Sequence, residues 1–200
     1  MMKGDMHMQN PSSDYLRVTD VLSPFSGVAS IPKDILKRAS ERGTAVHEYC
    51  TAIIQGMPLI DVDEAHKGYI KSFGQWYCDI DYKDFEFPDR FYDHDLMITG
   101  ECDVIYDNCI DGWTLVDFKT SARESKTWKY QGAAYAFMAK NKDINITRIE
   151  FVRLDKHGEA PIVYDYTKER SANWQEFMTL LEVYRKWFKS NPNAEYLEHL

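Results

Sequence analysis

The chain has few of the features that mark a secreted or membrane protein. Its 200 residues include only four cysteines, and no two of these cysteines form a Cys-x-x-Cys pair. No apolar run approaches the length of a membrane-spanning helix, and the first ten residues lack the apolar core of a signal peptide. We therefore expect a cytoplasmic protein with reduced thiols and without a membrane partner.

The chain also lacks the excess of positive charge that is typical of proteins that bind DNA with their whole surface. It carries 24 Lys and Arg residues against 32 Asp and Glu residues, which gives a formal net charge of −8. This balance argues against a simple electrostatic DNA binder, although it permits a local basic groove. Two basic groups could form such a groove or could equally be solvated faces. They are Lys33, Lys37, Arg38 and Arg42, and Lys119, Arg123, Lys126 and Lys129.

Internal repeats, low-complexity tracts and linker-like segments are absent from the sequence. The length suits one domain with a sizeable core, and hydrophobic and aromatic contents of 44% and 14% are typical of globular proteins. We therefore expect a single domain over residues 15–191. A flexible N-terminus over residues 1–14 and a loose C-terminal tail over residues 192–200 are expected beside it.

The spacing of apolar residues predicts an α/β fold with a mixed central β-sheet flanked by helices. Gly43 is expected to separate two helices, and Gly56 to stop the second of them. Pro88 favours an edge strand over a central one, because proline cannot donate to the strand ladder. Helices are expected over residues 32–42, 44–55, 63–79 and 172–190, and strands over residues 85–91, 144–154 and 160–166.

Most of the functional signal lies between residues 99 and 135. Two strand-like runs, residues 97–107 and 113–119, flank the dipeptide Asp111-Gly112, which is a strong signal for a β-hairpin. A helix rich in small residues is expected to follow over residues 127–141. A hairpin followed by a closely packed helix would bring these three segments together.

Acidic and basic side chains are expected to meet across this hairpin. Because side chains alternate along a strand, Asp117 and Lys119 project together and Phe118 points the opposite way. Together with a carboxylate on the neighbouring strand, they could hold a divalent cation and a water. An Asp-x-Lys sequence by itself is more often a solvated strand face. On the neighbouring strand the same alternation predicts Glu101, Asp103 and Ile105 on one side, and Cys102, Val104 and Tyr106 on the other.

Gln131 and Tyr135 are four residues apart on the expected helix and therefore share one face of it. The alanines and the glycine between and beside them let the helix backbone lie close to the sheet. From there an amide and a phenol could reach a phosphate backbone or support the lysine. The alternative is a tyrosine that only caps the core.

Four short segments carry a resemblance to a known family. They are RGTAVH at Arg42–His47, GECD at Gly100–Asp103, DFK at Asp117–Lys119 and QGAAY at Gln131–Tyr135. In this order and spacing, over about residues 16–165, the chain resembles the PD-(D/E)xK nucleases. Within them it is similar to the RecB-like branch, which includes phage-type exonucleases and the mitochondrial genome maintenance exonuclease. The resemblance implies a restriction-endonuclease-like core.

The resemblance implies a metal-dependent deoxyribonuclease, an exonuclease that hydrolyses phosphodiester bonds from DNA ends. Asp103, Asp117 and Lys119 would be catalytic. One or two Mg²⁺ or Mn²⁺ ions would be bound by Asp103, Asp117, the Phe118 carbonyl and His47. The second acid of the family is often Glu, and Asp117 stands in its place here. The residues expected to contact nucleic acid are Gln131, Tyr135, Arg123, Lys126 and Lys129.

His47 calls for a choice between two interpretations. A lone histidine on a helix is more often structural than a metal ligand. The resemblance instead places it beside the metal, as a ligand or as a close neighbour of the ligands. Imidazole suits manganese better than magnesium, which prefers oxygen.

Several further expectations depend on the same resemblance. Glu86 could be an additional acid of the site or a surface carboxylate. Some relatives hold an iron–sulfur cluster, but no cysteine follows Cys109, so no cluster is expected. The implied setting is phage-type or bacterial DNA recombination or repair, in the cytoplasm of the cell or host, with a recombination or single-strand-binding protein as a possible partner.

Two alternatives stay open, an endonuclease of the same fold and a catalytically silent DNA-binding adaptor for recombination. The sequence does not predict strand polarity, a preference for single or double strands, or the oligomeric state. DNA is favoured over RNA only by the resemblance.

Overall fold

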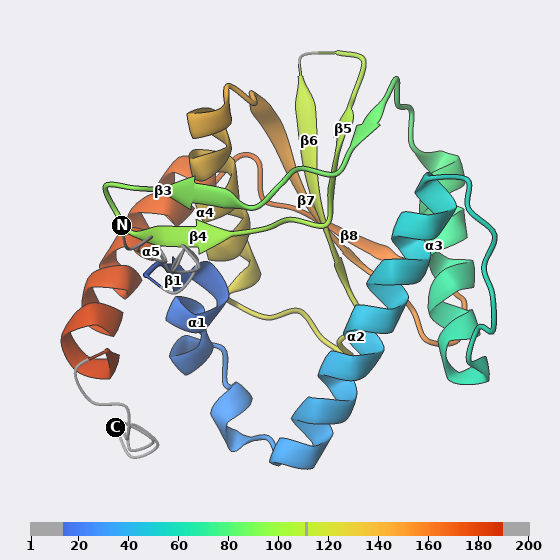
Figure 1. The fold of residues 1–200 in the computed structure, drawn as a ribbon, viewed down its shortest axis with the longest axis horizontal. Coiled ribbons are helices and arrows are strands. Elements are labelled where there is room, and N and C mark those ends of the chain that lie inside the picture. The colour runs from blue at the N-terminus through green and yellow to red at the C-terminus, as the bar shows by residue number, and fades with distance from the viewer. Residues whose placement is uncertain (1–13, 111, 190–200) are drawn as a thin grey trace, which may run out of the picture.

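The computed structural model describes residues 14–110 and 112–189. The expectations for the two chain ends beyond these limits, and for Asp111, fall outside the described residues. Within them the chain forms a five-stranded sheet of order β2-β5-β6-β7-β8 and a three-stranded sheet of order β1-β4-β3 (Figure 1). None of the described helices combines the length and the apolar character needed to cross a membrane.

The helices and strands occupy the following residues. The strands are β1 (Leu16–Arg17), β2 (Phe85–Glu86), β3 (Phe91–Asp93), β4 (Ile98–Gly100), β5 (Val104–Asp107), β6 (Trp113–Lys119), β7 (Ile146–Arg153) and β8 (Ile162–Asp165). The α-helices are α1 (Val18–Leu22), α2 (Lys33–Ile54), α3 (Lys67–Asp79), α4 (Trp128–Ala139) and α5 (Arg170–Val183). Short 3₁₀ turns cover Ser23–Phe25, Val28–Ser30, Glu64–His66 and Lys140–Lys142, and a π-helical turn covers Tyr184–Phe188.

The five-stranded sheet is mixed. Strands β5 and β6 pair antiparallel as the expected hairpin, and β2 pairs antiparallel with β5. Strand β7 pairs parallel with β6, and α4 lies in the crossover that a parallel pair requires. Strand β8 then pairs antiparallel with β7 at the edge. The expected mixed sheet flanked by helices is therefore confirmed.

Alternation along β6 separates two hydrophobic clusters. Leu115 belongs to a cluster that also contains residues of α1, α4 and α5, such as Val21, Ala134 and Phe177. Val116 and Phe118 belong to a second cluster, which contains residues of α2 and α3. The second cluster includes Val46, Cys50, Tyr69, Phe73 and Trp76. One strand therefore supplies side chains to two cores, and polar residues of β6 are positioned between rigid layers.

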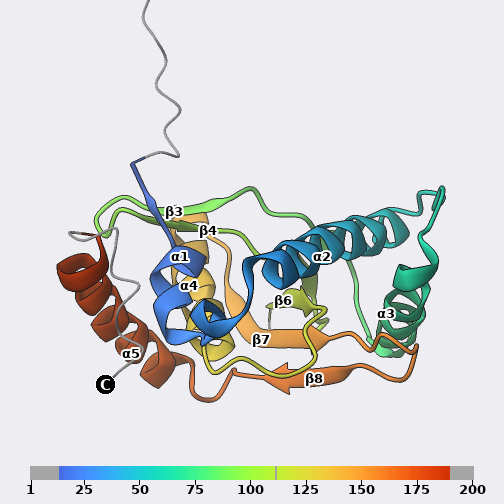
Figure 2. The same cartoon turned by 90° about the horizontal axis from the view of Figure 1, so that it is seen from below.

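Helix α4 is buried because it is packed between the two sheets (Figure 2). A Cβ atom on Gly132 would lie 2.5 Å from Ile149 of β7, and one on Gly100 of β4 would lie 2.2 Å from the Tyr135 ring. Both glycines are required by these close approaches of backbone to side chain. The expected close packing of this helix is confirmed, and it fixes the height at which Gln131 and Tyr135 stand over the sheet.

Gly43 does not separate two helices, because α2 runs without a break from Lys33 to Ile54. The expectation of two helices was wrong. A glycine costs only about 1 kcal/mol inside a helix, and burial of Val46 and Cys50 favours continuing it. In the exposed first half, ion pairs four residues apart join Asp34 to Arg38 and Lys37 to Glu41.

Two predicted strands are each divided between the two sheets. The run over residues 97–107 forms β4 in one sheet and β5 in the other, and residues 101–103 between them are not in a strand. Cys102 therefore packs in the same cluster as Ile105, and its expected place beside Val104 and Tyr106 was wrong. Within β5 the expected alternation is confirmed, because Val104 and Tyr106 belong to the other cluster. The run over residues 85–91 is likewise divided into β2 and β3, with Pro88 in the connection.

Candidate active site

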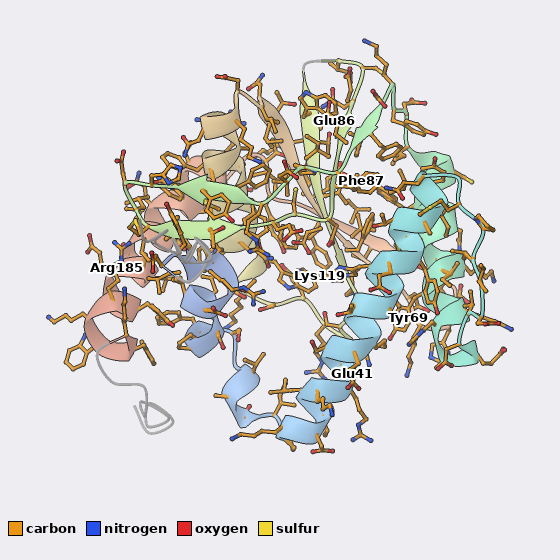
Figure 3. The ribbon with its side chains drawn as sticks, viewed as in Figure 1. Glu41, Tyr69, Glu86, Phe87, Lys119 and Arg185 are labelled. Atoms are coloured by element: carbon orange, nitrogen blue, oxygen red, sulfur yellow. The ribbon has the colours of Figure 1, made fainter. Side chains whose placement is uncertain are left out.

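The core residues predicted for the site line one cavity of about 870 Å³. His47 comes from α2, Asp117 and Lys119 from β6, and Gln131 and Tyr135 from α4. Asp103 joins them from the segment that connects the two sheets. In Figure 3 Lys119 lies near the centre of the molecule, between α2 and α4. The fold therefore brings together side chains that are up to 88 residues apart in the sequence, from His47 to Tyr135.

A buried ion pair stands on the wall of this cavity. Lys119 Nζ lies 2.6 Å from Asp117 Oδ1, and the two side chains are only 19% and 5% exposed. The ammonium also lies 5.1 Å from the centre of the Phe151 ring. Alternation along β6 explains the pair, because Asp117 and Lys119 share a face while Phe118 enters the opposite cluster.

The Gln131 amide holds both members of this pair. Its Nε2 donates to Asp117 Oδ2 at 3.1 Å, and its Oε1 accepts from Lys119 Nζ at 3.3 Å. The same Nε2 donates to the Tyr135 hydroxyl oxygen at 3.0 Å. The amide is thus oriented by a carboxylate, an ammonium and a phenol, and its two ends match the charges of Asp117 and Lys119.

Asp103 is held by two different partners. His47 Nδ1 lies 2.8 Å from Asp103 Oδ1, and the Phe118 N–H donates to Asp103 Oδ2 at 2.5 Å. The His47 ring also makes an edge contact with the Phe118 ring. Because Nδ1 faces Asp103, Nε2 is the ring nitrogen left for another partner. Phe118 contacts the site through its N–H, and the expected metal contact of its carbonyl stays a prediction.

The two carboxylates differ in their electrostatic surroundings. Burial, the largest influence, acts with the charge of Asp103 to raise the pKa of Asp117 from 3.8 to about 6, although Lys119 opposes the shift. Burial acts in the same direction on Asp103, but the charge and hydrogen bond of His47, helped by Lys119 and the Phe118 N–H, outweigh it and lower the pKa of Asp103. Asp103 is therefore held in its ionised form, whereas Asp117 keeps its proton to a higher pH than an ordinary aspartate does.

His47 shows the reciprocal effect. Burial alone would lower the pKa of its imidazole, but the Asp103 carboxylate raises it above the ordinary value, with a smaller contribution from Asp117. The histidine thus acts on Asp103 as a cationic partner when protonated and as a hydrogen-bonding partner when neutral.

The donor set fits a magnesium- or manganese-type ion rather than a closed protein cage. Among residues 14–110 and 112–189, no three His, Cys, Asp or Glu side chains are arranged so that they could enclose a metal ion. Mg²⁺ is usually bound by one or two carboxylates together with waters and substrate phosphates. Asp103 and Asp117 on the wall of one cavity match that requirement, with His47 beside them.

The basic residues predicted to contact nucleic acid are not gathered at the cavity. Arg123 lines a second cavity of about 780 Å³, which shares Thr19 and Gln131 with the first. The exposed Lys126 lines neither cavity, and Lys129 lies 3.6 Å from Glu176 of α5. Of the five residues predicted to contact nucleic acid, only Gln131 and Tyr135 therefore line the candidate site.

Glu86 also lies apart from the candidate site. Its side chain is exposed on β2 and does not line the cavity, and in Figure 3 it lies toward the tip of the β5–β6 hairpin, away from Lys119. This position fits the surface carboxylate that was one of the two interpretations of Glu86.

Several cavity residues escaped the sequence analysis. Met57, Phe87 and Pro88 form an apolar part of the wall, and Arg17 and Arg90 stand among the polar residues. They come from the end of β1 and from the connections after α2 and β2, where the local sequence does not say which side chains face a cavity. Only the tertiary packing brings them to the cavity that Asp103 lines.

Comparison with solved structures shows a distant likeness to an exonuclease-like protein. No protein-family model matches the chain, and no curated protein matches it either. Among solved structures, a candidate exonuclease from Eubacterium rectale is 12% identical, with a TM-score of 0.44 over 92% of this chain and 88% of that chain. At this level of identity and overlap, function has to be inferred from the residues of the chain itself.

Proposed function

We propose that this protein is a metal-dependent deoxyribonuclease that hydrolyses phosphodiester bonds from DNA ends. The observation that carries the proposal is the buried Asp117–Lys119 pair, held by Gln131 on the wall of a cavity that Asp103 also lines. Burying two charges is costly, and a well-packed apolar pair is often as stable. A charged pair that faces a cavity is therefore better explained by chemistry than by stability.

The acids and the lysine have separate roles in this proposal. Asp103 and Asp117 would hold one or two Mg²⁺ or Mn²⁺ ions, with the Phe118 carbonyl and His47 as further neighbours. Such an ion would lower the pKa of a bound water and neutralise charge developing on the phosphate. Lys119 orients the attacking water and stabilises the negative charge of the transition state.

The surrounding residues keep these groups in place. Gln131 fixes the distance between Lys119 and Asp117 through both ends of its amide, and Tyr135 fixes the amide. His47 and the Phe118 N–H hold the Asp103 carboxylate in its charged form. Most of these groups stand on β6, α2 and α4, and Asp103 beside them is held by His47 and the Phe118 N–H. The set therefore requires little rearrangement when substrate arrives.

We propose that the enzyme cleaves only from a DNA end. Within residues 14–110 and 112–189 the fold includes no separate DNA-reading module, so sequence-specific cutting has no structural basis there. The setting we propose is DNA recombination or repair, with DNA as the substrate.

The experiment compares end-labelled linear DNA with covalently closed circular plasmid, in Mg²⁺, in Mn²⁺ and in excess chelator. We expect linear DNA to be degraded to short products only with metal, while the closed circle survives. Asp103→Asn should abolish degradation, and Asp81→Asn, which changes an exposed aspartate between α3 and β2, should leave it unchanged.

Four outcomes would contradict the proposal in different ways. Degradation that continues in chelator would exclude the metal, and full activity in Asp103→Asn would exclude the site. Cleavage of the closed circle as fast as the linear form would show an endonuclease of the same fold. Binding of DNA without cleavage under every metal condition would favour the recombination adaptor.

A further inference from the structure

One part of the cavity wall is apolar and belongs to none of the catalytic groups. It consists of Met57, just after the end of α2, and of Phe87 and Pro88, in the connection between β2 and β3. We call these three residues the apolar rim. In the sequence Met57 is 46 residues from Asp103, and Phe87 and Pro88 are 16 and 15 residues from it. Tertiary packing brings all three to the cavity.

The rim is exposed although its side chains are hydrophobic. Met57 is 50% exposed and Phe87 is 37% exposed, whereas the large side chains of the two clusters are almost completely buried. Phe87 is not paired with another aromatic ring among the described residues, although Phe85, two positions earlier, contacts Tyr77, Tyr82 and Tyr106. Phe87 is therefore partly exposed and has no aromatic ring packed against it among the described residues.

The rim stands beside the catalytic acids. Strand β2 pairs antiparallel with β5 and ends at Glu86, which faces Ile105, so the chain continues toward Val104 and Asp103 as it leaves the sheet. Phe87, Pro88, Asp103 and Lys119 then line the same cavity. A group that lies on the rim is thus a neighbour of a group that lies at Asp103.

The cations of the cavity differ in whether they already have an acidic partner. Lys119 is paired with Asp117, and Arg90 lies 2.6 Å from Glu101. Arg17 is exposed on the cavity wall, and the described residues include no ion pair for it. An anionic ligand can therefore be bound by Arg17 without displacing a carboxylate.

The apolar rim and Arg17 line the same cavity as Asp103 and Asp117. An apolar surface suits the base of a nucleotide, and a cation suits its phosphate. We propose that the apolar rim stacks an unpaired base next to the scissile phosphate, while Arg17 binds a neighbouring phosphate. The inference rests on the proposed function and names its substrate class, namely single-stranded DNA or frayed ends. Inside a DNA duplex the base faces are covered by their neighbours and cannot reach the rim. Stacking on an aromatic side chain also compensates for a net charge of −8, which gives little general attraction to a duplex.

The test measures binding of fluorescent oligonucleotides in Ca²⁺, which occupies carboxylate sites but supports little turnover. The ligands are a short oligothymidylate, an abasic strand of the same length and a blunt duplex. We expect wild-type protein to prefer thymidylate over the abasic strand roughly tenfold, and Phe87→Ala to remove most of that preference. Phe87→Trp should keep it.

Two control variants separate stacking from other effects. Arg17→Ala should weaken binding of thymidylate and of the abasic strand by the same factor, because a phosphate contact does not depend on the base. Trp187→Ala removes an aromatic ring that is 60% exposed and does not line the cavity, and it should change neither affinity. Phe87 is exposed, and retained secondary structure and melting temperature would show that its variants fold.

Cleavage of the same strands in Mg²⁺ separates this inference from the proposed function. Loss of all cleavage by wild-type protein would overturn the nuclease proposal, and the base preference in binding would still decide the inference. An unchanged preference in Phe87→Ala, or a blunt duplex bound as tightly as thymidylate, would overturn the inference even if cleavage is robust.

Discussion

The two faces of β6 show opposite solutions to burying a strand. On the face toward α2 and α3, Phe118 packs with Phe73 and Trp76, each with its ring centre 5.2 Å away, in a cluster of apolar side chains. On the face toward α4, the adjacent Asp117 lies in a hydrogen-bonded polar group with Lys119 and Gln131. Both faces of β6 contribute to a core, since Leu115 packs on the same face as Asp117. Only toward the C-terminal end of the strand does that second face keep charges buried, at a cost that stability does not explain.

Phe118→Ala should cause the largest loss of folding stability, because it changes the apolar face of β6. Removing a buried phenylalanine ring costs about 3–5 kcal/mol, because the cavity left behind is only partly filled. Urea denaturation measures the loss, and Phe118→Leu should lose much less. If Phe118→Ala unfolds at the same urea concentration as the wild-type protein, the apolar face does not carry the fold as described.

The polar face of β6 should make folding stability depend on pH through Asp117. The pKa of Asp117 is raised in the folded protein from 3.8 to about 6, so the folded state binds more protons between these values than the unfolded state does. Its contribution to stability is therefore present below about pH 4 and is lost as the pH rises through about 6. The full difference corresponds to roughly 3 kcal/mol.

The effect is measured as the difference in unfolding free energy between wild-type protein and Asp117→Asn from pH 4 to pH 7. We expect the wild-type protein to lose stability relative to the variant as the pH rises. The lowered pKa of Asp103 acts in the opposite direction, since its contribution is lost as the pH falls, but both proteins retain Asp103. A difference that does not change with pH would mean that Asp117 is not electrostatically strained.

Gly100→Ala should disturb the polar group of Asp117, Lys119 and Gln131 indirectly, by displacing Tyr135. The added methyl group would lie 2.2 Å from the Tyr135 ring, so Tyr135 must move and Gln131 must move with it. We expect a loss of about 1–3 kcal/mol in stability and of roughly tenfold or more in cleavage rate. Gly74→Ala is the matched control, because nothing lies within 4 Å of its added methyl group. Equal activity of both variants would show that Tyr135 does not position the site.

The smallest effects are expected at the outlying basic residues. Arg123→Ala should weaken DNA binding a few-fold at low salt and reduce the slope of affinity against salt by about one, if Arg123 contacts a phosphate from the second cavity. Lys129→Ala should change binding less, because its ammonium already lies 3.6 Å from Glu176. A larger effect for Lys129 than for Arg123 would reverse this assignment.

The sequence was most informative where the periodicity of one element decides the geometry. Strand β6 spans Trp113–Lys119, as predicted, and its alternation alone is enough to place Asp117 with Lys119 and Phe118 opposite. The spacing of Gln131 and Tyr135 similarly predicted that they share one face of a helix, and a hydrogen bond of 3.0 Å joins their side chains.

The sequence was least informative where the result depends on which elements pair. Residues 97–107 look like one strand because each half alternates, but β4 and β5 belong to different sheets. Gly43 looks like a helix break because its intrinsic cost is visible locally and the tertiary packing that outweighs it is not. For the same reason Met57, Phe87 and Arg17 could not be assigned to the cavity before the fold was known.

The central claim is that Asp117 binds metal and Lys119 acts on the water, and calorimetry with Mn²⁺ tests it most directly. Wild-type protein, Asp117→Asn and Lys119→Met should be titrated at a pH well above 6, where Asp117 is ionised, and their cleavage of linear DNA measured in parallel. We predict that both variants lose cleavage by roughly a hundredfold or more, while only Asp117→Asn loses Mn²⁺ affinity. Equal loss of Mn²⁺ affinity in the two variants, or wild-type cleavage in either, would contradict the account.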